Sequence, residues 1–194
     1  MNKVAFFYAT FPRPTETFVR RELRAFAQIG FDPDLYSIWK GRSEWEGKKI
    51  LKFQFFRLLY LFFWIPYWAW LKPQVFKEIL VELWAKPCPN LQNWNETFLA
   101  LGFALVEARN LKNKKYSLLH GIWATMPATA ALALSKLTNT PFSMGAHAYD
   151  VFRTGGDWLL QYKFENALFI RTSSQSTARR IEQLGVPIKK IKLI

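Results

Sequence analysis

The sequence predicts an α/β protein built on a parallel, doubly wound sheet that is covered by helices on both faces. Short apolar runs, which are typical of buried strands, alternate along the chain with longer segments whose apolar residues recur at helical spacing. That alternation favours parallel strands joined by crossover helices. The chain has 194 residues, of which 51% are hydrophobic, so it is long enough for one sizeable core and short for two. We therefore expect a single domain over residues 1–194.

The first elements are a strand, a loop and a helix. Residues 4–9 form a short apolar run that suits a buried strand, and residues 20–29 follow with apolar positions at helical spacing. Residues 35–39 predict a second strand after a turn-prone Asp-Pro-Asp sequence. Residues 41–49 are polar and basic, and we expect them to form a connection.

An aromatic block at residues 53–71 interrupts this pattern. It reads FQFFRLLYLFFWIPYWAWL and lies within an insert at about residues 50–90, which we expect to be helical. The block is bordered by lysines and contains Pro66, and a spanning helix needs about 20 apolar residues. Trp and Tyr prefer the headgroup level, and flanking basic residues are attracted to anionic lipid. A helix lying in the membrane interface, a helical hairpin buried in the core and a spanning helix all stay open. The residues expected to contact a membrane are Arg57, Phe62, Phe63, Trp64, Trp68 and Trp70.

The second half of the chain returns to alternating strands and helices. We expect helices at residues 95–112, 127–137, 157–167 and 175–184 and strands at residues 116–120, 141–147, 168–172 and 188–194.

Composition limits the classes of partner. Lys and Arg number 27 against 14 Asp and Glu, which gives a net charge of +13 and suggests a phosphate-bearing ligand, nucleic acid or an anionic membrane. No recognised nucleic-acid motif accompanies the charge, and we expect no nucleic acid partner. Cys88 is the single cysteine, so no disulfide forms within the chain and a reducing, cytoplasmic setting is the simpler expectation. With two histidines far apart in the sequence, we predict no metal site.

Candidate site residues follow the predicted strands. Ligands of open parallel sheets bind at the carboxyl ends of the strands. Residues 11–18, His120, His147 with Asp150, and residues 172–174 all fall there. Either threonine in the first loop could cap the helix that follows it, and a carboxylate there could accept hydrogen bonds from sugar hydroxyls. Asp150 could cap a helix or orient His147 or a bound hydroxyl.

Three segments resemble retaining glycosyltransferases of family 4 (group 1). Residues 11–23, FPRPTETFVRREL, resemble that family's opening, in which a strand leads into a loop of the form FP-x-x-[ST]-E-T-F and a helix. Residues 120–152, HGIWATMPATAALALSKLTNTPFSMGAHAYDVF, resemble its His-x-His-Trp-Ala segment, its Pro-Ala-Thr helix and its strand ending in His-Ala-x-Asp-[IV]-Phe. Residues 169–185, FIRTSSQSTARRIEQLG, are similar to its next strand and Thr-x-Ser turn. The resemblance covers nearly the whole chain except residues 41–95.

The resemblance implies one half of a GT-B fold, in which two Rossmann-like domains face a cleft. This chain would be the N-terminal, acceptor-binding half, with the C-terminal donor-binding domain absent. His147 matches the cleft histidine, which would be the catalytic residue and bind a donor hydroxyl, whereas Ile122 replaces the second histidine of the His-x-His-Trp segment. The other positions expected to bind substrate are Thr15, Glu16, Thr17, Phe18, His120, Trp123, Asp150, Thr172 and Ser174.

The expected function is therefore transfer of a sugar from a nucleotide-sugar donor to a polysaccharide or lipid-linked acceptor, of the type used in exopolysaccharide or colanic-acid-like biosynthesis. The donor is a substrate, and we expect no cofactor. The chain alone is expected to be inactive, cytoplasmic and peripheral on the inner face of the plasma membrane. The alternative is a non-catalytic module on the same scaffold that binds anionic lipid or glycan.

Overall fold

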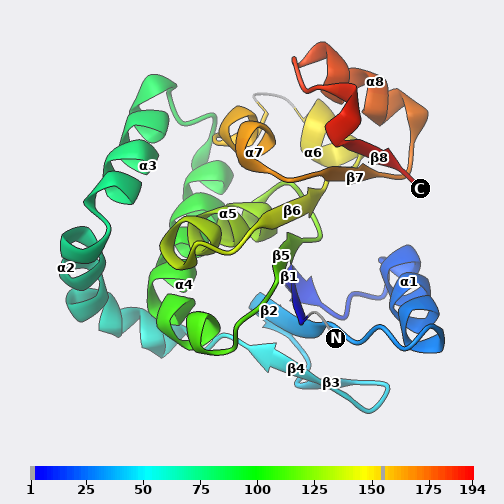
Figure 1. The fold of residues 1–194 in the computed structure, drawn as a ribbon, viewed down its shortest axis with the longest axis horizontal. Helices are drawn as coiled ribbons and strands as arrows, with labels where there is room; N and C mark the ends of the chain where they lie inside the picture. Colours follow the sequence, from blue (N-terminus) through cyan, green and yellow to red (C-terminus); the bar gives the residue numbers. More distant parts are fainter. Residues whose placement is uncertain (1–2, 154–155) are drawn as a thin grey trace.

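A computed structural model describes residues 3–153 and 156–194. Its centre is an eight-stranded sheet with the strand order β3-β4-β2-β1-β5-β6-β7-β8 (Figure 1). All neighbouring strands are parallel except β3 and β4, which form an antiparallel pair. The strands are β1 (Val4–Phe11), β2 (Asp34–Gly41), β3 (Glu44–Trp45), β4 (Lys48–Lys52), β5 (Leu118–Gly121), β6 (Phe142–Gly145), β7 (Ile170–Thr172) and β8 (Ile191–Leu193).

Helices cover both faces of the sheet, but unevenly. The α-helices are α1 (Thr17–Gln28), α2 (Leu61–Leu71), α3 (Pro73–Ala85), α4 (Leu91–Asn113), α5 (Met126–Thr138), α6 (Ala148–Phe152), α7 (Leu160–Asn166) and α8 (Gln175–Gln183), with short 3-10 helices η1 (Phe55–Tyr60) and η2 (Ile188–Lys190). Figure 1 shows α1 on one side of the sheet, α4 and α5 on the other side, and α2 and α3 farther out beyond α4.

Strand β1 separates two apolar cores because its successive side chains point to opposite faces. Ala5 and Phe7 belong to the larger core, which includes buried residues of α4, α5, α7 and α8. Phe6 and Tyr8 belong to the smaller core, which includes the buried residues of α1. The α/β fold class with helices on both faces is confirmed, and β1 is buried on both faces, as a central strand of a parallel sheet must be.

The polar connection expected at residues 41–49 is wrong in part, because a β-hairpin forms there. Strand β3 turns into β4 through Glu46 and Gly47, both of which have positive φ. Strand β4 then extends the sheet, with Ile50 opposite Leu35 of β2. Ile50 is buried in the smaller core and Leu51 packs against the larger core, so β4 is fixed to the sheet on both faces.

Several boundaries also differ from expectation. Helix α4 begins at Leu91, because the Asn90 side chain accepts a hydrogen bond of 2.9 Å from the backbone N–H of Asn93 and caps the helix. The strand expected at residues 141–147 ends at Gly145, and His147 lies beyond it at the start of α6.

The aromatic block folds as η1 and α2, and Pro66 lies inside α2. Trp68 was expected to contact a membrane, and this is wrong. Its side chain is 1% exposed, and its Nε1–H donates a 2.9 Å hydrogen bond to the carbonyl of Leu105 in α4. Within the described residues no helix combines the length and apolar character that crossing a bilayer requires.

Candidate functional site

Three loops at the carboxyl edge of the sheet bring Phe18, Trp123 and His147 together. Phe18 comes from the first turn of α1 after β1, Trp123 from the loop after β5, and His147 from the loop after β6. The Trp123 and His147 rings are 4.7 Å apart between centroids and the Phe18 and His147 rings 5.3 Å. The Phe18 and Trp123 rings are 5.7 Å apart. The three predicted site residues therefore form one aromatic cluster.

The position of His147 depends on Gly145. A Cβ on Gly145 would lie 2.2 Å from the carbonyl oxygen of Ile122, so only glycine lets β6 pass this close to the loop after β5. The same Cβ would lie 3.2 Å from His147 Nε2, which indicates how closely the imidazole folds back against the strand end.

Asp150 connects the loop after β5 to the loop after β6. Its Oδ2 accepts hydrogen bonds from the backbone N–H of Ala124 at 3.0 Å and of His147 at 3.3 Å. Asp150 thus caps α6 and holds the backbone of His147, while contact of Asp150 with a bound hydroxyl stays a prediction. The carboxylate is 1% exposed, and its Oδ1 has no hydrogen-bond partner within residues 3–153 and 156–194.

Burial sets the charge state of the site. Desolvation lowers the pKa of His147 to about 4, helped by the positive charge of Arg171 and opposed in part by the Ile122 carbonyl. Desolvation raises the pKa of Asp150 to about 6, while the two backbone N–H groups act in the opposite direction. At neutral pH His147 is therefore uncharged and Asp150 is ionised. The Nε2 of His147 is buried and has no hydrogen-bond partner among the described residues, so a ligand would reach it only after a small movement of the surrounding rings.

The loop after β1 supplies a second polar group. Glu16 is the N-cap residue of α1, and no side chain caps this helix, so the alternative that Thr15 or Thr17 caps it is wrong. Both threonines are exposed. Glu16 is buried, and desolvation raises the pKa of its carboxyl, whereas Arg13 and Trp123 lower it. Its Oε2 is buried and has no hydrogen-bond partner in the described part of the chain.

His120 does not lie on the open rim as expected. It is the third residue of β5, and its ring is 3% exposed on the α1 face of the sheet. Its Nδ1 lies 2.7 Å from the Ser143 hydroxyl, and its ring packs 5.1 Å from Phe6 between centroids. Burial lowers the pKa of His120 to about 3. The enclosed position rules out direct contact with a ligand in this conformation.

Thr172 and Ser174 lie at the end of β7 and differ from each other. Ser174 caps α8, because its hydroxyl accepts a 3.2 Å hydrogen bond from the backbone N–H of Thr177. Thr172 is 1% exposed, and its hydroxyl makes no bond to another described residue. A capping role accounts for Ser174, and substrate contact by Thr172 stays a prediction.

Sequence reasoning missed two charged groups that support the site. Arg171 in β7 makes a bidentate ion pair with Glu22 in α1 and is the charge that acts on both histidines. Lys163 in α7 is fully buried and donates hydrogen bonds to Asp157 and to the carbonyl of Ala124. A lysine inside a predicted helix gives no sign of burial, so only the folded chain reveals this contact.

Residues 3–153 and 156–194 contain no group of three or more His, Cys, Asp or Glu side chains that could hold a metal ion. The groups at the site are the aromatic rings of Phe18 and Trp123, the neutral imidazole of His147 and the buried carboxylate of Glu16. Aromatic faces and hydrogen-bonding groups side by side are suited to polyhydroxylated molecules.

Comparison with known proteins identifies a solved structure with a similar fold. No family model matches the sequence, and no curated protein matches it. Among solved structures, the apo form of the lipopolysaccharide outer core galactosyltransferase WaaB is similar, with a TM-score of 0.59 at 12% sequence identity. The match covers 98% of this chain and 44% of the galactosyltransferase. The chain therefore has the Rossmann-like α/β fold of one half of a GT-B protein.

Proposed function

We propose that the chain is the N-terminal, acceptor-binding half of a retaining glycosyltransferase of family 4. The transferase would move a sugar from a nucleotide-sugar donor to a polysaccharide or lipid-linked acceptor, as in exopolysaccharide biosynthesis. The observation that carries the proposal is the cluster of Phe18, Trp123 and His147, which gathers three family-like motifs at the edge where parallel sheets bind ligands. Similarity in fold to a galactosyltransferase supports it.

Each site group has a role in this proposal. Trp123 and Phe18 supply apolar faces for a sugar ring, and the neutral His147 hydrogen-bonds a hydroxyl of the transferred sugar. Glu16 accepts a hydrogen bond from an acceptor hydroxyl. A second, donor-binding domain supplies the nucleotide site, no cofactor takes part, and the half described here is inactive alone.

Replacing His147 by alanine tests the catalytic assignment. The protein expressed from its whole reading frame is incubated with membrane extract and radiolabelled nucleotide sugars, and label in the glycan fraction is counted. We expect His147→Ala to lower kcat by about 10²-fold, as when one buried hydrogen-bonding group is lost from a transition state. Tyr149→Ala is the matched control, because Tyr149 is 56% exposed on the neighbouring helix turn. Equal turnover by His147→Ala and the control refutes the assignment.

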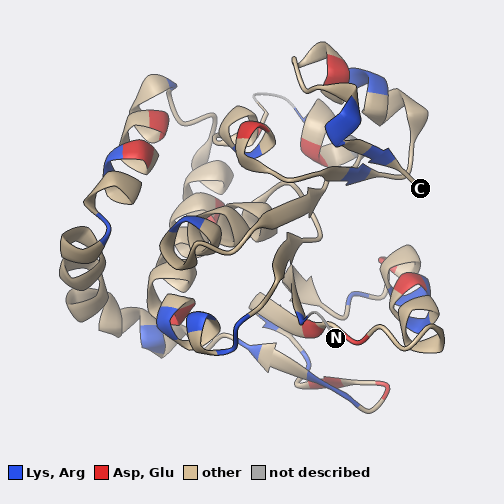
Figure 2. Cartoon of the chain, in the orientation of Figure 1, with Lys and Arg blue, Asp and Glu red and all other residues tan. Residues whose placement is uncertain are grey.

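We extend the proposal to membrane contact through α2. This helix is apolar all round, a pattern found in helices surrounded by protein or lipid. Yet Phe62 is 80% exposed, Phe63 66% and Trp70 81%. Figure 2 shows no charged position along α2. An exposed apolar surface of this kind marks an interaction site. The net charge of +13 favours an anionic bilayer, which agrees with a peripheral location on the inner face of the plasma membrane.

Vesicle sedimentation tests this contact. We expect the chain to sediment with vesicles of phosphatidylglycerol and phosphatidylcholine. The double variant Phe62→Ser/Trp70→Ser should weaken binding by about tenfold or more, since each buried aromatic side chain contributes about 1.5–3 kcal/mol. The double variant Ile29→Ser/Ile188→Ser is the control, because Ile29 is 76% and Ile188 71% exposed on other elements. Equal binding by both double variants contradicts the assignment of α2.

Trp64 and Arg57 have smaller parts in this contact. Trp64 is partly buried and packs against the larger core, and Arg57 pairs with Glu107 of α4.

If vesicles bind while no sugar transfer is detected for the whole protein, the non-catalytic lipid-binding module becomes the better description.

A further inference from the structure

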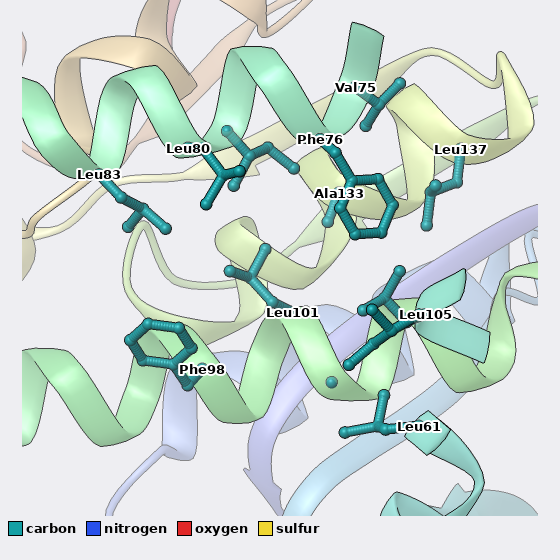
Figure 3. A pocket seen from close by; sticks show the side chains of 13 residues that line it. Leu61, Val75, Phe76, Leu80, Leu83, Phe98, Leu101, Leu105, Ala133 and Leu137 are labelled. Atoms are coloured by element: carbon teal, nitrogen blue, oxygen red, sulfur yellow. The ribbon is translucent and has the colours of Figure 1, made fainter. Parts of the chain in front are cut away.

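A cavity of about 370 Å³ lies between α3 on one side and α4 on the other, closed by α2 and α5 (Figure 3). Leu80 and Leu83 of α3 face Phe98 and Leu101 of α4 across it. This volume falls in the range of about 300–1,000 Å³ that is typical of ligand pockets. None of the candidate sugar-site residues lines the cavity, so it is a separate feature of the molecule.

The walls of the cavity are apolar throughout. Every one of its lining residues is Leu, Ile, Val, Phe, Ala or Gly. Water in such a space finds no hydrogen-bond partners, and an empty space forfeits the dispersion contacts of its walls. The cavity is also accessible, because its lining residues Ile65, Leu80 and Phe98 are 45%, 52% and 42% exposed. Hydrocarbon is the ligand chemistry that such walls accept.

Polar contacts hold the surrounding helices in place around the cavity. Trp68 fastens α2 to α4 through its bond to the Leu105 carbonyl. On the far side of α3, Glu78 accepts hydrogen bonds of 2.9 Å from Lys136 of α5 and from Tyr162 of α7. Helix α3 is therefore tied to α5 and α7 by polar contacts of Glu78, a residue that does not line the cavity.

We propose that this cavity binds one hydrocarbon chain of a membrane lipid. The inference rests on the membrane contact proposed above, because α2 forms both the exposed aromatic surface and part of the cavity wall. Lys72 joins α2 to α3, and Lys77 is exposed one turn into α3. Their charges are complementary to the phosphate of an anionic headgroup. A lipid could therefore leave its headgroup beside these lysines while one chain enters between α3 and α4.

Binding of the fluorescent fatty acid cis-parinaric acid in the absence of membranes tests the cavity. We expect fluorescence to rise when the wild-type chain is added and to fall when palmitate displaces the probe. Leu101→Trp fills the cavity from α4, and Ala133→Leu fills it from α5. Each methylene excluded from an apolar site weakens binding about fourfold. We therefore expect each variant to bind cis-parinaric acid at least about tenfold more weakly than the wild type does. Leu91→Trp is the matched control on α4, since Leu91 is 73% exposed and does not line the cavity.

The two membrane proposals fail separately. If the cavity proposal holds, Leu101→Trp and Ala133→Leu lose the probe while still sedimenting with vesicles, and Phe62→Ser/Trp70→Ser keeps the probe while losing vesicles. Circular dichroism and thermal unfolding establish that each variant is folded, and palmitate should raise the Tm of the wild type but not of the two filled variants. No fluorescence gain with the wild type, or unchanged affinity in both filled variants, overturns the cavity proposal.

Discussion

The two histidines occupy different depths at the same edge of the sheet. His147 faces Phe18 and Trp123 with its Nε2 unbonded within the described chain, whereas His120 is enclosed beside Ser143. Both have lowered pKa values, to about 4 and about 3, chiefly because burial disfavours the charged ring. Folding therefore keeps both imidazoles neutral under conditions in which an unfolded chain would protonate them.

The difference between the folded and unfolded pKa values of the histidines predicts how the stability of the fold depends on pH. Below the ordinary pKa of about 6.5 the unfolded histidines bind protons that the folded ones do not, so the free energy of unfolding falls as pH decreases. Asp150 acts the other way below pH 6, because its folded carboxyl binds a proton that the unfolded one releases. We expect a net loss of about 1–3 kcal/mol between pH 7 and pH 5, measured by urea unfolding.

The chain offers its own control, because it contains no other histidine. His120→Asn/His147→Asn should abolish the loss and leave the smaller gain from Asp150. A double variant that still loses stability like the wild type means that other groups titrate in this range.

Single residues show what the sequence could predict at this scale. His147 was identifiable because a strand, a small-residue turn and the histidine follow one another, and the structure brings it to Trp123 and Phe18. His120 looked equivalent because it also ends a predicted strand, but strand alternation turns its ring toward α1. Trp68 looked like its aromatic neighbours, and only the packing of α2 on α4 distinguishes it from Trp70.

Among the elements, the loops after β5 and β6 depend on α7. Lys163 donates to the carbonyl of Ala124 while Asp150 accepts from the N–H of Ala124, so the two peptide units that flank this residue are both held. Lys163 is in turn paired with Asp157, and both side chains are almost fully buried. Helix α7 therefore fixes the loop that carries Trp123.

Replacing Lys163 separates stability from site geometry. Lys163→Met leaves Asp157 buried without its partner and should lower the free energy of unfolding by about 3–5 kcal/mol, measured with urea. Lys163→Met/Asp157→Leu removes both charges and should recover much of that loss. Sugar-transfer activity of the whole protein should fall in the single variant and should not recover in the double variant, because the Ala124 carbonyl lacks its donor in both. Full activity in the double variant would mean that Lys163 contributes stability alone.

Helix α2 could be predicted as an apolar helix but not placed. Its sequence lacks polar residues that would distinguish an outward face, so periodicity could not say which side packs on α4. The hairpin of β3 and β4 was missed for the opposite reason. Its charged residues outnumber its apolar residues, which are Trp45, Ile50 and Leu51, so the segment lacks the long apolar run of a buried strand.

At the scale of the whole molecule, the order of strands and helices was predictable because local periodicity determines it. The distribution of helices over the two faces was not. Connections that run from β1 toward β2 place α1 on one face, whereas those that run from β5 toward β8 place their helices on the other face, as right-handed crossovers require. The candidate site lies where these two directions diverge, at the ends of β1 and β5.

The hydrogen bond between Trp68 and Leu105 ties α2 to α4, and α4 packs directly on α5. Attachment of α2 to a bilayer would therefore fix the orientation of the entire sheet relative to the lipid plane. In the transferase proposed above, His147 would then stand at one height above the headgroups, and that height would favour acceptors whose glycan has a matching length.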